Sequence, residues 1–128
     1  MPLASGRIRV GFDEDALSED LARLSPRGQQ ALRRGREEFE RDGIPAERLL
    51  ACHAEHSSGT DLPGCLKTYL PDWNGEWRMV FQIAADETGL LLSYLAGGVG
   101  HQPRGARAPD VYQIAHHRLY GRWPRRSR

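Results

Sequence analysis

The chain has 128 residues, of which 39% are hydrophobic and 27% are charged. This length suits one compact core and is short for two. The sequence reaches a charge at Arg7 before any apolar run of signal-peptide length, and no stretch approaches the roughly 18 consecutive apolar residues of a membrane span. We therefore expect a cytoplasmic protein with one domain over residues 1–121 and no membrane contact.

The net charge of +1 conceals an uneven distribution of charge along the chain. Residues 101–128 contain seven arginines and one aspartate, which gives this end a charge of +6 and leaves −5 for residues 1–100. A basic end of this kind favours binding to a polyanion, and a solubilising extension is the plainer alternative. We interpret residues 122–128 as a basic C-terminal tail.

Metal-binding patterns are weak in this sequence. The two cysteines, Cys52 and Cys65, are too few for a disulfide framework. Cys52, His53, Glu55 and His56 have side chains that bind metals, but they are nearly contiguous and no second cluster follows them. We expect reduced thiols, no metal and no cofactor.

The first half of the chain predicts a strand followed by two helices. Residues 7–12 alternate polar and apolar side chains, as a strand with one buried face does. Asp13 stands where an N-cap would, before an apolar stripe that extends to Leu24. Ser25 caps a second helix over residues 26–42, which Gly43 ends. Charged residues surround this second helix, and we interpret them as a solvated face with mutual ion pairs.

The second half predicts an antiparallel meander over residues 62–70, 75–83 and 90–95, joined by turn sequences. Alternation in the middle strand places Trp77, Met79, Phe81 and Ile83 on a core face, and it places Arg78 on the opposite, open face. Lys67 projects from the neighbouring strand on the same side as Arg78. Because two cations on one open face repel each other unless an anion lies between them, this pair predicts an anion site.

Glycines and a final helix follow the meander. Gly97, Gly98 and Gly100 let the backbone bend and let a ligand approach closely. After a basic loop, Asp110 caps a helix in which Tyr112 comes early enough to overhang the sheet edge. The predicted fold is therefore α+β, with an N-terminal strand and helical pair packed on an antiparallel β-sheet meander that ends in a C-terminal helix.

This order of elements resembles the RelE/ParE superfamily of bacterial toxins, and the likeness covers residues 7–119. The motifs that carry it are Leu62 to Lys67, Gly75 to Ile83, and Val99-Gly100 followed by Asp110-Val111-Tyr112. The resemblance is strongest to the RelE branch of ribosome-dependent messenger RNA endonucleases.

The resemblance implies roles for individual residues. Lys67 matches a family lysine that acts as a base or stabilises charge, Arg78 matches the arginine that steadies the scissile phosphate, and Tyr112 matches a tyrosine that stacks on and orients the substrate. The chain departs from the family in two places. Tyr69 stands where a second basic residue is common, and His101-Gln102 stands where an arginine follows the Val-Gly pair, so that Arg104 or Arg107 is the candidate replacement.

The implied reaction is metal-independent cleavage of RNA. It needs a deprotonated 2′-hydroxyl, a stabilised phosphorane and a protonated 5′-oxygen. His101 titrates near neutral pH and suits the last role, with an ordinary strand-end residue as the alternative. The catalytic candidates are Lys67, Arg78, His101 and Tyr112, and the candidates for substrate binding are Tyr69, Arg104, Arg107 and Arg118.

From the resemblance we expect the toxin of a type II toxin–antitoxin system, which cleaves messenger RNA on the ribosome, inhibits translation and forms a hetero-oligomer with its cognate antitoxin. One alternative is a ParE-like inhibitor of gyrase without nuclease chemistry, and another is an RNA-binding regulatory module that uses the arginine tail. Retention of Lys67 and Arg78 favours the nuclease. Loss of the second basic residue at Tyr69 favours the gyrase inhibitor.

Overall fold

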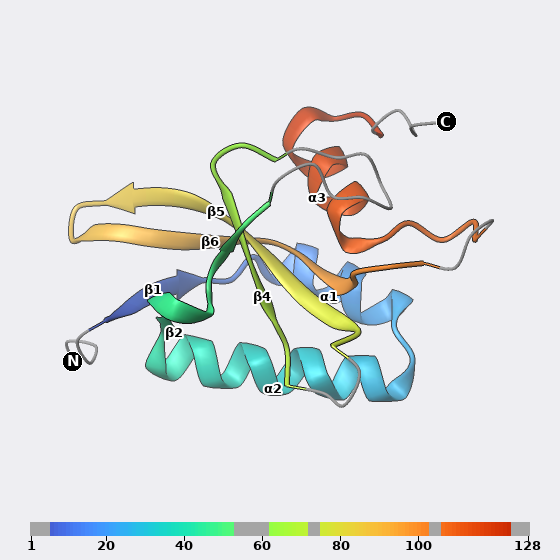
Figure 1. The fold of residues 1–128 in the computed structure, drawn as a ribbon, viewed down its shortest axis with the longest axis horizontal. Helices are drawn as coiled ribbons and strands as arrows, with labels where there is room; N and C mark the ends of the chain where they lie inside the picture. The colour runs from blue at the N-terminus through green and yellow to red at the C-terminus, as the bar shows by residue number, and fades with distance from the viewer. Residues whose placement is uncertain (1–5, 53–61, 72–74, 103–105, 124–128) are drawn as a thin grey trace.

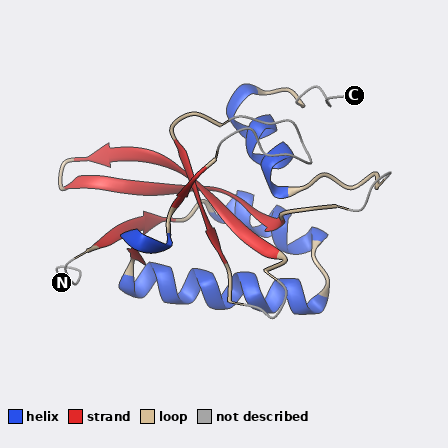
Figure 2. Cartoon of the chain, viewed as in Figure 1, coloured by secondary structure: helices blue, strands red, loops and turns tan. Residues whose placement is uncertain are grey.

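A computed structural model describes residues 6–52, 62–71, 75–102 and 106–123 (Figure 1). The described chain is α+β, with helices on both sides of one curled, mixed sheet (Figure 2). In chain order its elements are β1 (Arg7–Gly11), α1 (Glu14–Arg23), α2 (Pro26–Asp42), β2 (Ile44–Pro45), a 3-10 turn η1 (Ala46–Arg48), β3 (Leu50–Ala51), β4 (Cys65–Tyr69), β5 (Trp77–Asp86), β6 (Gly89–Val99) and α3 (Val111–Tyr120).

The helix boundaries follow from local capping. Asp13 accepts a hydrogen bond from the Ala16 backbone N at 3.1 Å, and Ser25 accepts one from the Gly28 N at 3.3 Å. Gly43 ends α2 with a φ of 72°, a conformation that residues with a Cβ rarely adopt. These boundaries confirm the prediction for both helices, because each depends on residues within one turn of the helix end.

The sheet has the strand order β2-β1-β6-β5-β4-β3. Strands β4, β5 and β6 form the predicted antiparallel meander. In addition, β1 runs parallel to β6, with Arg9 opposite Leu91. Neither this parallel pair nor the two-residue strands β2 and β3 at the edges were predicted from the sequence. Both kinds of pairing join segments that are distant in the sequence or too short to show an alternating pattern.

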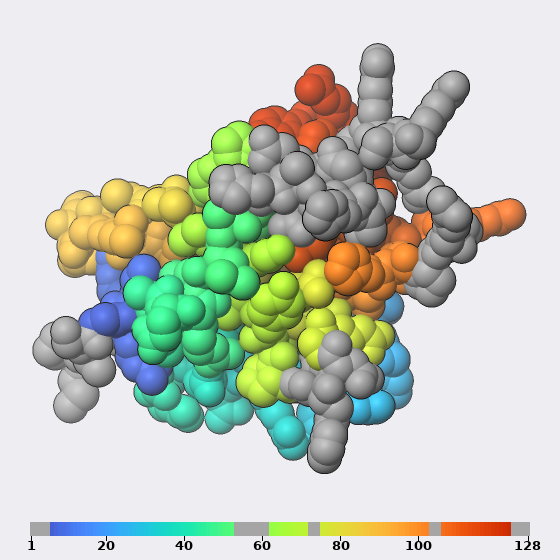
Figure 3. All heavy atoms as spheres, in the orientation of Figure 1, coloured from blue at the N-terminus to red at the C-terminus, as the bar shows by residue number. Residues whose placement is uncertain are grey.

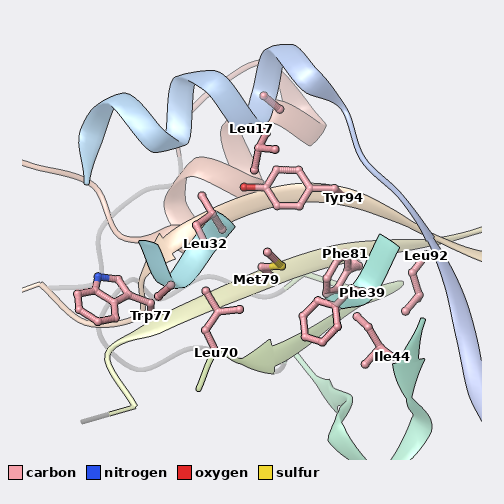
Figure 4. Close-up of a cluster of buried hydrophobic side chains, with 12 residues drawn as sticks. Leu17, Leu32, Phe39, Ile44, Leu70, Trp77, Met79, Phe81, Leu92 and Tyr94 are labelled. Atoms are coloured by element: carbon pink, nitrogen blue, oxygen red, sulfur yellow. The ribbon is translucent and has the colours of Figure 1, made fainter. Parts of the chain in front are cut away.

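Both faces of the inner half of β5 are covered. On one side α1 and α2 pack against Trp77, Met79 and Phe81, and Figure 4 shows Leu17 and Leu32 beside Tyr94 in this layer. On the other side α3 packs against Val80. The prediction of an open second face was therefore wrong, because α3 returns over it. Ile83, predicted to be buried, is 45% exposed, since the β5–β6 hairpin extends beyond α1 and α3 (Figure 1).

The charged side of α2 forms the expected ion pairs. Arg36 contacts both Glu40, at 2.9 Å, and Glu14, and Arg48 contacts Glu38 at 3.1 Å. This confirms the interpretation of a solvated charged face. Among the described helices, none is long and apolar enough to cross a membrane.

Candidate functional site

Strand pairing sets the candidate site on the face of the sheet that α3 covers. Lys67 lies opposite Val80 and Tyr69 lies opposite Arg78 across the β4–β5 ladder. Because paired residues point to the same face, Lys67, Tyr69 and Arg78 project together, as the sequence predicted for the two cations. In the space-filling view, β4 and the chain that follows β6 meet on one surface (Figure 3).

Helix α3 brings Tyr112 to this face. Asp110 and Gln113 form a reciprocal capping box with hydrogen bonds of 2.9 Å, which fixes the first turn of the helix. The Nη1 of Arg78 donates to the Tyr112 hydroxyl at 3.0 Å. The Nζ of Lys67 lies 5.3 Å from the centre of the same ring. Tyr112 therefore contacts both cations, Arg78 through its hydroxyl and Lys67 through its ring.

Arg78 is enclosed by aromatic rings and backbone. Its Cζ lies 4.6 Å from the ring centre of Tyr69 and 5.9 Å from that of Tyr112, both within cation–π range. A Cβ added to Gly100 would overlap the guanidinium of Arg78. Only 8% of the residue is exposed, and its Nε is buried without a hydrogen-bond partner. A buried guanidinium with an unused N–H suits an anion.

The expectations about Arg78, Tyr112 and two of the three glycines at this site were wrong. Arg78 was expected to be exposed, and Tyr112 was expected to overhang the sheet edge, but Tyr112 is fully buried. The glycines were expected to admit a ligand. Instead Gly97 makes room for Leu32 and Tyr94 and Gly100 makes room for Arg78, whereas a Cβ at Gly98 would meet nothing within 4 Å. Packing of α3 on the sheet accounts for the burial of Tyr112, and packing of α2 places Leu32 against Gly97.

The remaining candidates lie in different surroundings. Tyr69 is 40% exposed and forms the outer wall of the Arg78 enclosure. His101 is exposed and follows Gly100, whose backbone N donates to the Glu76 carbonyl at 2.9 Å. Arg107 is exposed, and Arg104 lies outside the described residues.

Arg118, a candidate for substrate binding, forms a partly buried ion pair with Asp20. Its Nη2 donates to Asp20 Oδ1 at 2.8 Å, and its Nη1 donates to Asp20 Oδ2 at 2.9 Å. Asp20 was not among the candidate residues of the sequence, yet it is 1% exposed. One signal was present: Asp20 follows Ala16 and Leu17 at helical spacing, so it lies on the buried stripe.

Metal ligands do not gather in the part of the chain that the structure describes, where no group of three His, Cys, Asp or Glu side chains lies together. Of the contiguous set considered above, His53, Glu55 and His56 lie outside the described residues. Cys52 and Cys65 are buried in the α3 layer, and burial raises the pKa of the Cys65 thiol. A thiol of this kind is a poor nucleophile.

Comparison with known proteins gives one similar structure. No protein-family model matches the chain, and no curated protein matches it. Among solved structures, the chain is similar to a mutant of the E. coli toxin RelE in the free state, in which two arginines are replaced by alanine. The identity is 20% and the TM-score is 0.38, over 73% of this chain and 83% of that one.

Proposed function

We propose that this chain is the toxin of a type II toxin–antitoxin system and that it cleaves messenger RNA on the ribosome. The observation that carries the proposal is the convergence of Arg78 and Lys67 on Tyr112, with the Arg78 Nε lacking a hydrogen-bond partner. A phosphate group placed at this point satisfies the unused N–H and offsets both positive charges.

Each candidate residue has its own role in the proposed cleavage of RNA. Arg78 holds the phosphorane oxygens with its planar fork, and Lys67 serves as the base or as a second charge stabiliser. Tyr112 accepts from Arg78 and is buried, so it orients the guanidinium rather than stacking on the substrate. Tyr69 is exposed and takes the stacking role on a nucleobase. His101, also exposed, is the candidate that protonates the leaving 5′-oxygen.

The test is the effect of Arg78→Ala on cleavage of messages in translating ribosomes, read by primer extension. Loss of one preorganised charge contact should lower the cleavage rate about a hundredfold or more. Arg41→Ala, which removes an exposed arginine from α2, is the control and should cut like the wild type. Equal cutting by wild type and Arg78→Ala would show that the chain is not this nuclease.

A second candidate function is inhibition of gyrase without cleavage of RNA. The burial of Arg78 and Tyr112 favours it, because a substrate must reach a guanidinium that is 8% exposed. Growth arrest without any cut message, together with inhibited DNA supercoiling, would support this candidate. Under either function we propose that a cognate antitoxin covers the face of the sheet that carries Lys67 and Arg78.

A further inference from the structure

One buried carboxylate joins three elements of the fold. Asp20 on α1 accepts from both terminal nitrogens of Arg118 on α3. Its Oδ2 also accepts from the Tyr94 hydroxyl at 2.6 Å and from the Gly97 backbone N at 2.9 Å, both on β6. Arg118 in turn donates to the backbone oxygens of Leu95 and Ala16. We call Asp20 and Arg118 the α1–α3 latch.

The latch reaches the candidate site by two routes. Through Arg118 it fixes the last turn of α3, the helix that supplies Tyr112 in its first turn. Through Gly97 it fixes β6 at the residue beside Gly98, which lies opposite Arg78 in the β5–β6 ladder. The two sides of the hydrogen bond between Arg78 and Tyr112 are therefore tied to one carboxylate.

The chemistry of the latch is better suited to fixing a position than to adding stability. A buried ion pair recovers little more than the free energy lost on desolvation, and apolar residues of similar volume often replace such pairs without loss of stability. Hydrogen bonds to a planar guanidinium are directional, however, and Arg118 on α3 has four acceptors, three on α1 and one on β6. Apolar contacts alone allow a short helix to shift on the sheet, whereas this set of bonds does not.

We propose that Asp20 is a positioning residue, which acts through Arg118 and Gly97 to hold Tyr112 at hydrogen-bonding distance from Arg78. The part of this inference that concerns cleavage rests on the proposed function. Its geometric part does not, because the hydrogen bond between Arg78 and Tyr112 exists without substrate.

The experiment measures the geometric part first. In the wild type, the Arg78 Nε–H is buried and should exchange slowly with solvent, so its side-chain resonance is observable by NMR and can be assigned with Arg78→Lys. Asp20→Asn keeps the size and one acceptor oxygen but removes the charge. We expect hydrogen exchange at the Arg78 Nε to accelerate about tenfold or more. Asp15→Asn, an exposed acid on the same helix, is the matched control and should leave exchange unchanged.

Cleavage is measured second, in single turnover at saturating substrate. Displacement of a catalytic group by about 1 Å can lower a rate a hundredfold, so Asp20→Asn should slow cleavage by tenfold or more with a smaller change in substrate affinity. If Asp20→Asn does not fold, Arg118→Lys is the second variant. It keeps the ion pair but loses the planar fork, and the same two changes are expected.

The double variant Asp20→Asn, Arg118→Met separates positioning from stability. It removes both buried charges, so its melting temperature should recover towards the wild type while cleavage stays slow. Unchanged exchange at the Arg78 Nε in a folded latch variant would overturn the inference, as would cleavage that recovers together with stability in the double variant. If Arg78→Ala cuts like the wild type, the proposed function fails, yet the exchange measurement still decides whether the latch sets the position of Arg78.

Discussion

The guanidinium of Arg78 carries a full positive charge into a site walled by Tyr69, Tyr112 and the backbone at Gly100. Charged groups are costly to bury without a partner that neutralises them. Aromatic faces and one phenol offset part of this cost, but the buried Nε–H remains unsatisfied. An anion bound beside Arg78 would supply both a negative charge and an acceptor for this N–H group.

Gly100 is the residue whose side-chain size controls this site. Gly100→Ala should displace the Arg78 guanidinium from Tyr112, because the new Cβ occupies its position. Since the end of an arginine side chain can move, we expect a loss of stability of about 1 to 3 kcal/mol, which leaves the chain folded. Cleavage should fall at least tenfold in a single-turnover assay.

Gly11→Ala is the matched control for this variant. A Cβ at Gly11 meets Leu91 at 3.8 Å, which is ordinary van der Waals contact. If Gly100→Ala cleaves RNA as fast as Gly11→Ala does, the position of Arg78 against Gly100 has no catalytic value.

Because of Tyr94, the free energy of unfolding should depend on pH in the alkaline range. Burial, reinforced by the Asp20 carboxylate, raises the pKa of the Tyr94 phenol far above its usual range. The unfolded chain releases the phenol proton near pH 10, whereas the folded chain keeps it. The contribution of Tyr94 to the free energy of unfolding is therefore complete below about pH 10 and declines as the pH rises further. Denaturant unfolding between about pH 9 and pH 11 should therefore give a steeper decline for the wild type than for Tyr94→Phe.

The comparison for this prediction is Tyr120→Phe, which removes an exposed phenol and should keep the slope of the wild type. At neutral pH, Tyr94→Phe should cost about 1 to 2 kcal/mol, because Asp20 loses a donor. Parallel slopes for wild type and Tyr94→Phe would mean that the phenol ionises in the folded chain.

The shared face of Lys67 and Arg78 could be predicted from the sequence, because alternation and a hairpin turn are local signals. The burial of Arg78 could not, since it depends on α3, a helix more than thirty residues further along the chain. The role of Asp20 was hidden for the same reason: its partner Arg118 is 98 residues away. Residue types and spacing identify a charged candidate residue, but they do not show which distant element buries its side chain or pairs with it.

At the scale of elements, α1 carries Asp20 and its start depends on one cap. Asp13→Ala removes the acceptor for the Ala16 N–H and should lower the free energy of unfolding by about 1 kcal/mol. Asp15→Ala, in the same turn but exposed and outside the cap, should cost only a few tenths of a kcal/mol. Chemical denaturation of both variants measures the difference, and equal losses would show that the Asp13 hydrogen bond contributes nothing.

The elements that the sequence predicted well are those defined by neighbouring residues. The caps at Asp13, Ser25 and Asp110 and the turn at Asp86 to Gly89 are all of this kind. The pairing of β1 with β6 was missed because a parallel pair leaves no turn sequence between its strands. Local chemistry specifies where elements begin and end, whereas their order in the sheet is a property of the whole chain.

At the scale of the molecule, the basic C-terminal end should provide affinity rather than chemistry. In the structure Trp123 stacks on His117 with ring centres 4.3 Å apart, so a truncation after this residue keeps the stacked pair. Deleting residues 124–128 removes three arginines. Each lost phosphate contact should reduce the salt slope of RNA binding by about 0.7. Single-turnover cleavage at saturation should be nearly unchanged.

A variant with the same change in net charge serves as its control. Arg33, Arg34 and Arg41 are exposed on α2, and their joint replacement by glutamine should leave the salt slope close to that of the wild type. If the truncated chain binds with full affinity and an unchanged slope, residues 124–128 are only a solubilising extension. Binding would then depend on Arg107 and the sheet face.

The parallel contact of β1 with β6 also determines when the chain can fold during its own synthesis. Arg9 has no strand partner on its β6 side until Leu91 has left the ribosomal tunnel, and Arg78 lacks its phenol until Tyr112 follows. Such distant pairings make folding slow and late. A nascent chain therefore emerges with the hydrogen bond between Arg78 and Tyr112 unformed, and under the proposed function it cannot cleave RNA until α3 has been made.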